Sequence, residues 1–305
     1  MFARMENRPR IIRSLVFSLA HDEDKILALA EKGMDAICLD MEDLTPLPYK
    51  EEARRVVPAV ASKLASRGVV VFARTNAMAD GMAAADLDAI VSADVHCVSL
   101  PKATRAEEMI EFDALVTAAE ARRGLPPGYT LVRPVIETAM GVKNAYEIAS
   151  ASPRVAYMGG VSGSMWGDLG ASLGYTPMPD GNETFYVRSK VLVDVRAAGV
   201  PFPIGGGGMF RRDAEGYQVF AFENKGLGYN GMHVPGSAEL IAVVNDAFTP
   251  TKEQIEEWLS LMPTVEAAER DGFTTFYVGE RLFDLAGAVR AREQLDLARR
   301  LGLID

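Results

Sequence analysis

The stretch DAICLDMEDLTPLPYKEEARRVVPAVASKLASRGVVVFART, residues 35–75, decides the fold. Two short apolar runs, at 35–40 and 69–75, enclose a helical stretch at 49–68 that ends on Gly68, the residue type that commonly stops a helix. Two strands joined through a helix pair in parallel, because the helix carries the chain back to the end where the first strand began. The stretch therefore predicts one β–α–β unit.

The same alternation of apolar runs and helical stretches continues along the chain. Strands are predicted at 14–19, 35–40, 69–75, 95–100, 130–137, 154–159 and 200–205, with a weaker eighth at 227–232. Eight such units close naturally into a barrel, so the predicted fold class is α/β, a (β/α)8 TIM barrel with a C-terminal helical extension. A doubly wound open sheet is the alternative. No glycine-rich dinucleotide fingerprint follows an early strand, which disfavours it.

The pattern changes after residue 250, which predicts a barrel over 1–250 and an extension over 251–305. The pattern of the extension predicts a helix, then the short segment FTTFYVGERLF (273–283), then a final helix DLAGAVRAREQLDLARRLG (284–302). Such an extension either packs on its own barrel or reaches a neighbouring subunit.

Composition limits the functions that the chain can have. With 49% hydrophobic residues in 305, the chain can bury a large core, and its net charge of -10 argues against nucleic-acid binding. We find neither an 18-residue apolar span nor a signal-peptide pattern, so we expect no membrane anchor and a cytoplasmic location. Cys38 and Cys97 lie in apolar strand-like runs and are expected to be reduced core thiols.

Functional groups of a parallel barrel gather at the carboxyl ends of its strands. Polar residues follow five of the predicted strands at this end: Asp40, Glu42, Asp43, Arg74, Asn76, Lys102, Glu137 and Asp168. Two carboxylates from neighbouring strand ends, completed by water and substrate oxygens, suit Mg2+, and Glu137 with Asp168 is the predicted pair. A zinc or iron site is disfavoured because the chain has only three histidines.

Each of these residues also has a structural interpretation. Acids at strand ends often cap the next helix, and Arg74 could serve only to neutralise the acids around it. Lys102 is interpreted as a solvated loop charge or an ion-pair partner rather than a Schiff-base lysine. His96, inside a strand, is expected to be a satisfied core residue, whereas His233 either faces the site or is structural. The stretch PIGGGGMF (203–210) is either a phosphate cradle or a mobile lid.

Taken in order, nine motifs resemble those of a known family. They are RSLVFS, AICLDMEDLTPLPYKEEAR, VFARTNAM, VSLPKAT, PVIETAMGV, GDLGASLGY, VRSKVLVDVRAAGVP, GYNG and VNDAFTPT. The chain is similar, over nearly its whole length, to the citrate lyase beta-subunit-like branch of the HpcH/HpaI aldolase family. This resemblance implies a metal-dependent (β/α)8 barrel that makes or breaks a carbon–carbon bond, commonly in a CoA thioester.

The resemblance also implies roles for individual residues. Glu137 and Asp168 resemble the family's ligands for Mg2+, with Mn2+ as a substitute, and Arg74 resembles the arginine that faces the substrate's carbonyl and carboxylate oxygens. Asp284 is similar to an aspartate that the family's C-terminal segment lends to a neighbouring active site, which implies a homo-oligomer, a trimer or hexamer.

Five further positions complete the implied site. Asp40, Glu42 and Asp43 match the acids beside the metal-bound water, and Lys50 matches the lysine that follows them. Gly167 stands where an acid is common in the family, so one partner of the metal site is missing from the sequence. The segment NGMHVPGSAEL (230–240) also lacks a lysine that the family's motif usually carries there.

The function implied is cleavage or formation of a 3-hydroxyacyl-CoA, of the malyl-CoA or citramalyl-CoA type. The reaction would proceed through a metal-bound 2-oxo acid, pyruvate or glyoxylate, and an enolate. Two alternatives stay open at this point. One is a class II pyruvate aldolase that acts on free aldehydes without CoA. The other is a non-catalytic binding or regulatory homologue.

Overall fold

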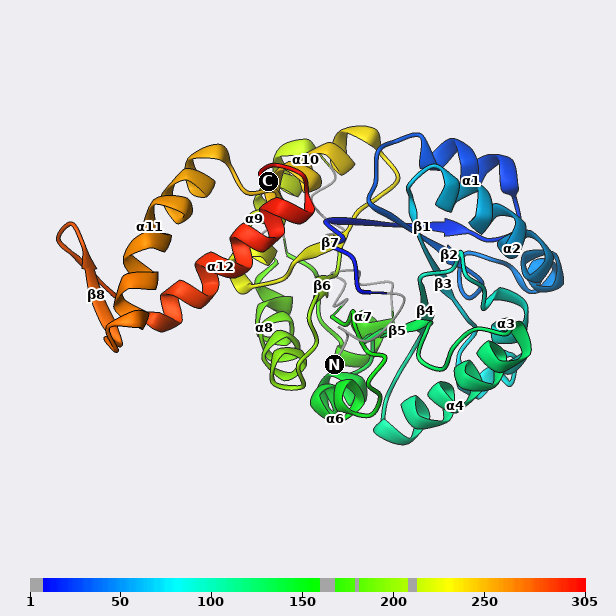
Figure 1. Ribbon diagram of the computed structural model, residues 1–305. Coiled ribbons are helices and arrows are strands. Elements are labelled where there is room, and N and C mark those ends of the chain that lie inside the picture. The colour runs from blue at the N-terminus through cyan, green and yellow to red at the C-terminus, as the bar shows by residue number, and fades with distance from the viewer. Residues whose placement is uncertain (1–7, 160–167, 179–180, 208–212) are drawn as a thin grey trace. The chain divides into compact units, whose positions relative to one another are not determined.

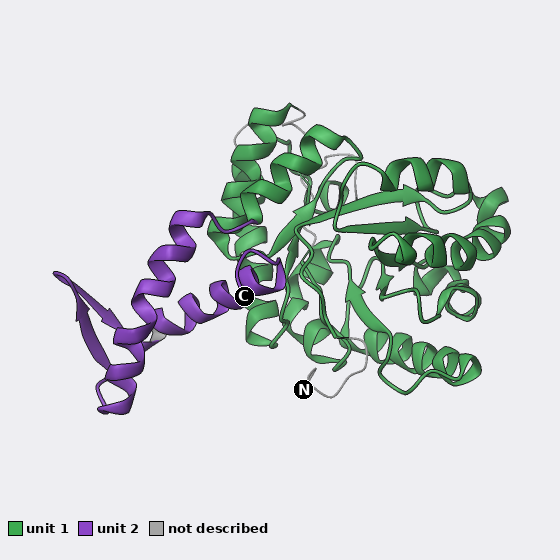
Figure 2. Cartoon of the chain, turned by 45° about the horizontal axis from the view of Figure 1, so that its top comes forward, with its two compact units in different colours: residues 1–248 green, residues 249–305 purple. Residues whose placement is uncertain are grey.

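The structure, a computed structural model, describes residues 8–159, 168–178, 181–207 and 213–305. It divides into two compact units, residues 1–248 and residues 249–305, shown in different colours in Figure 2. Each unit is described below by itself.

Seven parallel strands form the sheet of the first unit, in the order β5-β4-β3-β2-β1-β7-β6. The strands are β1 (Ser14–Leu19), β2 (Ala36–Asp40), β3 (Val70–Arg74), β4 (Cys97–Leu100), β5 (Leu131–Pro134), β6 (Ile204–Gly205) and β7 (Gly231–His233). Consecutive strands from β1 to β5 are neighbours, as expected when each helix returns the chain to the next position of a barrel.

The segment 154–159 fills the eighth position. It makes isolated parallel bridges to β5, between Val132 and Val155 and between Val135 and Gly159, and a further bridge joins Gly159 to Ile204 of β6. These bridges connect the two edges of the seven-stranded sheet, so the barrel fold predicted from the sequence is confirmed. The predicted strand at 154–159 differs only in pairing through bridges rather than through a continuous ladder.

The weak strand predicted at 227–232 lies a few residues later in the structure, because the preceding helix continues to Leu227. At Gly231 the chain approaches the segment just before β1 so closely that an added Cβ would lie 1.9 Å from the carbonyl oxygen of Ile12. Only glycine fits this position without displacing backbone.

Helices surround the strands of the first unit (Figure 1). They are α1 (Glu23–Ala30), α2 (Lys50–Ser66), α3 (Ala83–Ile90), α4 (Ala106–Arg123), α5 (Ala139–Lys143), α6 (Ala145–Ser150), α7 (Asp168–Leu173), α8 (Asn182–Ala197), α9 (Ala214–Leu227) and α10 (Ala238–Phe248), with 3-10 turns η2 (Leu47–Tyr49) and η3 (Met78–Asp80). None of the helices that the structure describes, in either unit, is long and apolar enough to cross a membrane.

Two apolar layers result from the alternation of side chains along the strands. The larger layer joins the outward strand faces to the helices, and the smaller one fills the barrel with residues such as Phe72 and Leu131. Cys38 and Cys97 are free thiols in the inner layer, as predicted. His96 is also a satisfied core residue, since its Nε2 atom lies 2.9 Å from the hydroxyl of Tyr157 and burial lowers its pKa to about 3.

The second unit is a helix, a hairpin and a helix: α11 (Lys252–Arg270), β8 (Thr275–Val278), β9 (Arg281–Asp284) and α12 (Leu285–Arg300). Helix α11 starts with a capping box between Thr251 and Gln254. Its apolar side chains pack on those of α12 and on Phe276 of the hairpin.

Candidate active site at the carboxyl ends of the barrel strands

Asp40 and Arg74 are the last residues of β2 and β3 and are paired directly in the register of the sheet. The guanidinium binds the carboxylate at both oxygens, with Nε 2.7 Å from Oδ1 and Nη2 2.6 Å from Oδ2. Asp40 also accepts the backbone N–H groups of Glu42 and Leu44. The Asp40 carboxylate is therefore fully used in orienting Arg74 and in shaping the loop after β2.

Glu42 lies between two cations. Its Oε2 atom is 2.8 Å from Nη1 of Arg74, and its Oε1 atom is 2.9 Å from Nζ of Lys102. Burial raises the pKa of Glu42 to about 7, although the charges of Arg74 and Lys102 act in the opposite direction. Glu42 can therefore change its protonation near neutral pH, as suits a proton-transfer group.

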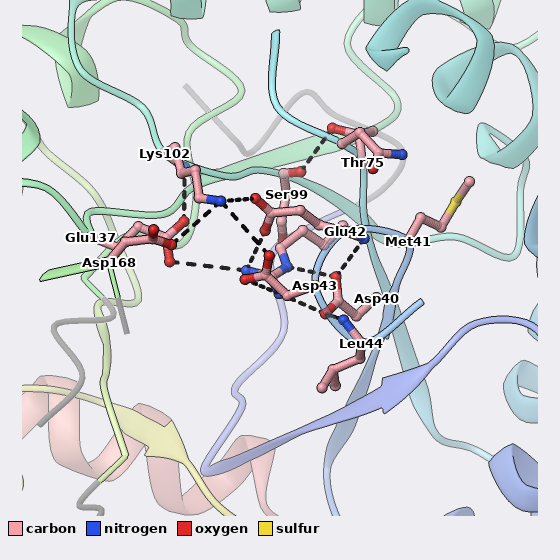
Figure 3. Close-up of polar contacts among 12 residues, drawn as sticks. Asp40, Met41, Glu42, Asp43, Leu44, Thr75, Ser99, Lys102, Glu137 and Asp168 are labelled. Carbon is pink, nitrogen blue, oxygen red and sulfur yellow. Dashed lines mark hydrogen bonds and ion pairs between the residues drawn. The ribbon is translucent and has the colours of Figure 1, made fainter. Parts of the chain in front are cut away.

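Lys102 links the acids of the site through both its backbone and its side chain (Figure 3). Its N–H donates to Oε1 of Glu137 at 2.9 Å, and its ammonium lies 3.4 Å from Oδ2 of Asp168 and 3.7 Å from Oδ1 of Asp43. Lys102 has a φ of 51°, the one positive φ at a non-glycine residue in the described chain, and such backbone strain is common at functional sites. Of its two interpretations, the ion-pair partner is the one that these contacts support.

Glu137 and Asp168 come from neighbouring β/α units and interact electrostatically. Burial raises the pKa of Glu137, Arg74 and the N–H of Lys102 lower it, and the charge of Asp168 raises it further. Nη1 of Arg74 lies 4.0 Å from Oε2 of Glu137. The three groups predicted to form the centre of the site are therefore together.

Backbone contacts hold this pair in place. Ala139, at the start of α5, donates its N–H to Oγ of Ser172 on α7, the helix that begins with Asp168. Gly141 lets α5 pack tightly on the loop after β4, since an added Cβ would lie 2.5 Å from the carbonyl oxygen of Ala103. The same loop carries Lys102, whose N–H donates to Glu137.

The donor set fits a hard divalent cation. Two cations, Arg74 and Lys102, face an excess of carboxyl groups. The carboxyl groups are those of Asp40, Glu42, Asp43, Glu137 and Asp168. In the described part of the chain, no group of three or more His, Cys, Asp or Glu side chains is arranged to hold a metal. Two carboxylates completed by water and substrate oxygens are a ligand set that Mg2+ accepts.

Residues 13–235 match the sequence profile described as HpcH/HpaI aldolase/citrate lyase, which covers most of the barrel. The chain belongs to this family.

Three curated relatives within the HpcH/HpaI family extend the likeness over most of the chain. The citrate lyase subunit beta of Leuconostoc mesenteroides subsp. cremoris is 29% identical over 302 residues, which cover 98% of this chain and 97% of that protein. The mitochondrial citramalyl-CoA lyase of Rattus norvegicus is 27% identical and covers 94% and 86% of the two chains. The L-malyl-CoA/beta-methylmalyl-CoA lyase of Rhodobacter capsulatus is 27% identical and covers 86% and 87%.

Solved structures of the family show the same fold. A citrate lyase from Burkholderia xenovorans LB400 superposes with a TM-score of 0.77 at 19% identity, over 98% of this chain and 95% of that one. CitE from Mycobacterium tuberculosis, in complex with magnesium and pyruvate, superposes with a TM-score of 0.60 at 26% identity, over 79% of this chain and 92% of that one.

The structure places the other predicted site residues as follows. Lys50 is buried and donates from Nζ to the carbonyl oxygens of Met41 and Glu42 at 2.5 and 2.6 Å, so it holds the loop after β2. Asp43 is exposed at the edge of the site. Gly167 lies outside the described residues. Asp284 belongs to the second unit, where it caps α12 by accepting the N–H of Gly287.

Arg133 was missed in the sequence, although a charged residue inside the apolar run LVRPVIE was the available signal. It is fully buried on β5, and its Nη2 atom is hydrogen-bonded to Nε2 of His233. Burial and the charges of Arg133 and Arg74 hold the pKa of His233 well below its usual range, so the imidazole is neutral. His233, for which two interpretations were open, thus contacts a cation near the barrel mouth.

Proposed function

We propose that this chain is a Mg2+-dependent carbon–carbon lyase that cleaves or forms a 3-hydroxyacyl-CoA of the malyl-CoA or citramalyl-CoA type. One observation carries the proposal. Arg74, Glu137 and Asp168 gather at the carboxyl end of the barrel, with Nη1 of Arg74 4.0 Å from Glu137 and the Glu137 and Asp168 carboxylates close enough to repel each other. Relatives named for citramalyl-CoA and malyl-CoA support the CoA ester.

Glu137 and Asp168 would hold the metal ion. Mycobacterium tuberculosis CitE, 26% identical, is known in complex with magnesium and pyruvate, which supports both the ion and a 2-oxo acid as ligands. When bound, the ion acts as a Lewis acid that polarises the carbonyl of the 2-oxo acid. Lys102 would keep Glu137 in position through its backbone N–H.

Arg74 would bind the oxygens on which charge develops. Its planar fork can contact two oxygens at once, which a lysine cannot do, and Asp40 fixes the orientation of the fork. Nη1 and Nη2 reach Glu42 and Asp43 at 2.8 and 3.8 Å, on the side of the guanidinium where the acids of the site lie.

In the cleavage direction, the hydroxyl proton of the substrate leaves as the carbon–carbon bond breaks. The bonding electrons pass to the thioester part as an enolate, and a proton is then added to its carbon. Glu42 and Asp43 would hold the water that takes the first proton, since Glu42 titrates near neutral pH. Asp284 of a neighbouring subunit would move the second proton, which requires a homo-oligomer, by resemblance a trimer or hexamer.

The test is cleavage of malyl-CoA, citramalyl-CoA and citryl-CoA by the purified chain, followed by the release of the 2-oxo acid. We expect turnover of at least one ester with Mg2+, its loss on chelation, and recovery with Mg2+ or Mn2+. Asp88→Asn, on an exposed ion pair with Arg122, serves as the control that keeps activity. Cleavage that resists chelation would refute the mechanism, and aldol addition of pyruvate to free aldehydes without any CoA-ester turnover would favour the class II aldolase.

A further inference from the structure

Arg133 is a buried cation inside the barrel. Its exposed fraction is 0%, and its Nη2 atom donates to Nε2 of His233. Its Nε and Nη1 atoms have no hydrogen-bond partner among the residues that the structure describes. Arginine stays protonated in proteins, so a positive charge and the hydrogens of two nitrogen atoms are withdrawn from water without compensation. Native structures satisfy such groups with ordered water or with a bound ion.

The groups around Arg133 do not balance its charge. The thiols of Cys38 and Cys97 interact with it, but burial raises the pKa of Cys38 to about 12 and that of Cys97 well above its usual range, so both stay neutral at physiological pH. Arg74 adds a like charge, and its effect on Arg133 exceeds that of the Glu137 carboxylate. Within the described residues, the charge of Arg133 is therefore left without an anion.

Arg154 shows what Arg133 lacks. It is also buried, with 4% exposure, and its guanidinium binds the carboxylates of Asp113 and Glu120. Glu120 is itself fully buried and accepts from Nη1 and Nη2 of Arg154 at 2.7 and 2.8 Å. The same barrel thus buries one guanidinium against an anion held at two points, whereas no described side chain does this for Arg133.

Ser99 adds a second unpartnered group beside Arg133. The two residues are paired in the register of β4 and β5, so their side chains leave the same face of the sheet. That face is the inside of the barrel, because Leu131, two residues before Arg133, belongs to the inner apolar layer. Ser99 is fully buried, and its Oγ atom has no hydrogen-bond partner among the described residues. Phe17, whose ring lies 5.8 Å from Cζ of Arg133, is partly exposed, so solvent reaches the edge of this layer.

We propose that Arg133 and Ser99 form a binding site for a small monovalent anion of the halide class, such as chloride, inside the barrel. The guanidinium and the hydroxyl offer hydrogens and one positive charge, and a halide accepts hydrogen bonds from several directions while it supplies one negative charge. A water molecule would satisfy the donors but would leave the charge unbalanced. The inference does not depend on the proposed function, since the site uses none of the residues that would hold the metal ion or move protons.

Bromide locates the site directly, because it can replace chloride and scatters X-rays anomalously. Crystals of the full chain are grown in sodium bromide without chloride, and diffraction is measured at the bromine absorption edge. We expect an anomalous peak within hydrogen-bonding distance of the Arg133 guanidinium and of Oγ of Ser99, and no such peak in Arg133→Met. An ordered water molecule at this place, without an anomalous peak, would overturn the inference.

Thermal stability measures the same binding in solution. The chelator-treated protein is melted in about 100 mM sodium chloride and in equimolar sodium gluconate, whose anion is too bulky for a fully buried site. An anion that binds only the folded chain raises the melting temperature, and we expect a difference of at least about 2 °C between the two salts. The difference should vanish in Arg133→Met and shrink in Ser99→Ala, which keeps the charge but loses one donor.

Arg122→Met is the matched control. It removes an arginine from an exposed ion pair with Asp88 and should keep the full difference between the two salts, because general salt effects act on it as on the native protein. Equal differences in the native protein and in Arg133→Met would overturn the inference. Should Arg133→Met fail to fold, the bromide data of the native protein still decide between an anion and water.

Discussion

The ammonium of Lys102 lies 3.4 Å from Oδ2 of Asp168, one of the two carboxylates proposed to hold the metal ion. The same ammonium contacts Glu42 at 2.9 Å. The negative charges of Glu42, Asp43 and Asp168 raise the pKa of Lys102, although burial opposes its charged form. The Lys102 ammonium thus serves as a counter-ion beside the proposed metal site. When Mg2+ is bound there, the ammonium and the metal ion repel each other.

Replacing Lys102 should therefore strengthen metal binding. We expect Lys102→Met to bind Mg2+ about tenfold more tightly or better in calorimetric titration, because a like charge near the ion is removed. The metal-free variant should melt at a lower temperature, since the acids lose their counter-charge. Lys102→Arg, which keeps the charge, is the control with near-native affinity. Weaker Mg2+ binding by Lys102→Met would mean that the ammonium assists the metal rather than competing with it.

Glu137→Gln tests the proposed metal ligand directly. Loss of one of two protein carboxylates should weaken Mg2+ binding by at least about a hundredfold and abolish turnover, with an unchanged circular dichroism spectrum. Without metal, the variant should be at least as stable as the native protein, because burial and the charge of Asp168 disfavour the ionised form of Glu137. Near-native Mg2+ affinity would remove Glu137 from the metal site.

The barrel was predictable because its signal is repeated. Each β–α unit carries the same alternation of apolar and helical residues, so errors at single boundaries, such as the late start of β7 at Gly231, do not change the result. The acids and Arg74 were predictable for a similar reason, since parallel strands bring their carboxyl ends to one rim.

Contacts across the barrel could not be predicted from the sequence. Whether Lys102 points to solvent or to acids depends on a left-handed backbone conformation that its sequence neighbourhood does not signal. The pairing of Arg133 with His233 joins residues 100 positions apart. Asp40 illustrates a third case, because sequence position placed it in the site but only the geometry shows that Arg74 and two backbone N–H groups occupy its oxygens.

Glu42 should make the stability of the metal-free protein depend on pH. Burial raises its pKa from an ordinary 4.5 to about 7, so between these values the folded protein binds a proton that the unfolded chain has released. The free energy of unfolding must then fall as the pH rises through this range, by about 2 kcal/mol between pH 5 and pH 8.

Glu42→Gln, which resembles the protonated side chain, isolates this effect. Denaturant unfolding in the presence of a chelator should show the native protein losing about 2 kcal/mol more stability than the variant between pH 5 and pH 8. Titrating groups away from Glu42 are common to both proteins and cancel in the difference. Parallel pH profiles would show that Glu42 has an ordinary pKa.

Asp284 has a structural function in the second unit that must be separated from its proposed catalytic one. Its carboxylate accepts the N–H of Gly287 at 2.8 Å and caps α12. Asp284→Ala removes both the cap and the carboxylate, at a cost of about 1 kcal/mol in stability, whereas Asp284→Ser keeps a capping oxygen without an ionisable acid. If Asp284 carries a proton, both variants lose turnover, but only Asp284→Ala melts at a clearly lower temperature.

Mixed oligomers show where that proton is used. Asp284→Ser and Glu137→Gln subunits are each expected to be inactive, but co-expressed subunits should regain part of the native activity if Asp284 of one subunit completes the metal site of another. Activity in homogeneous Asp284→Ser would restrict the residue to its capping role. Inactivity of both the variant and the mixture would place Asp284 in the site of its own chain.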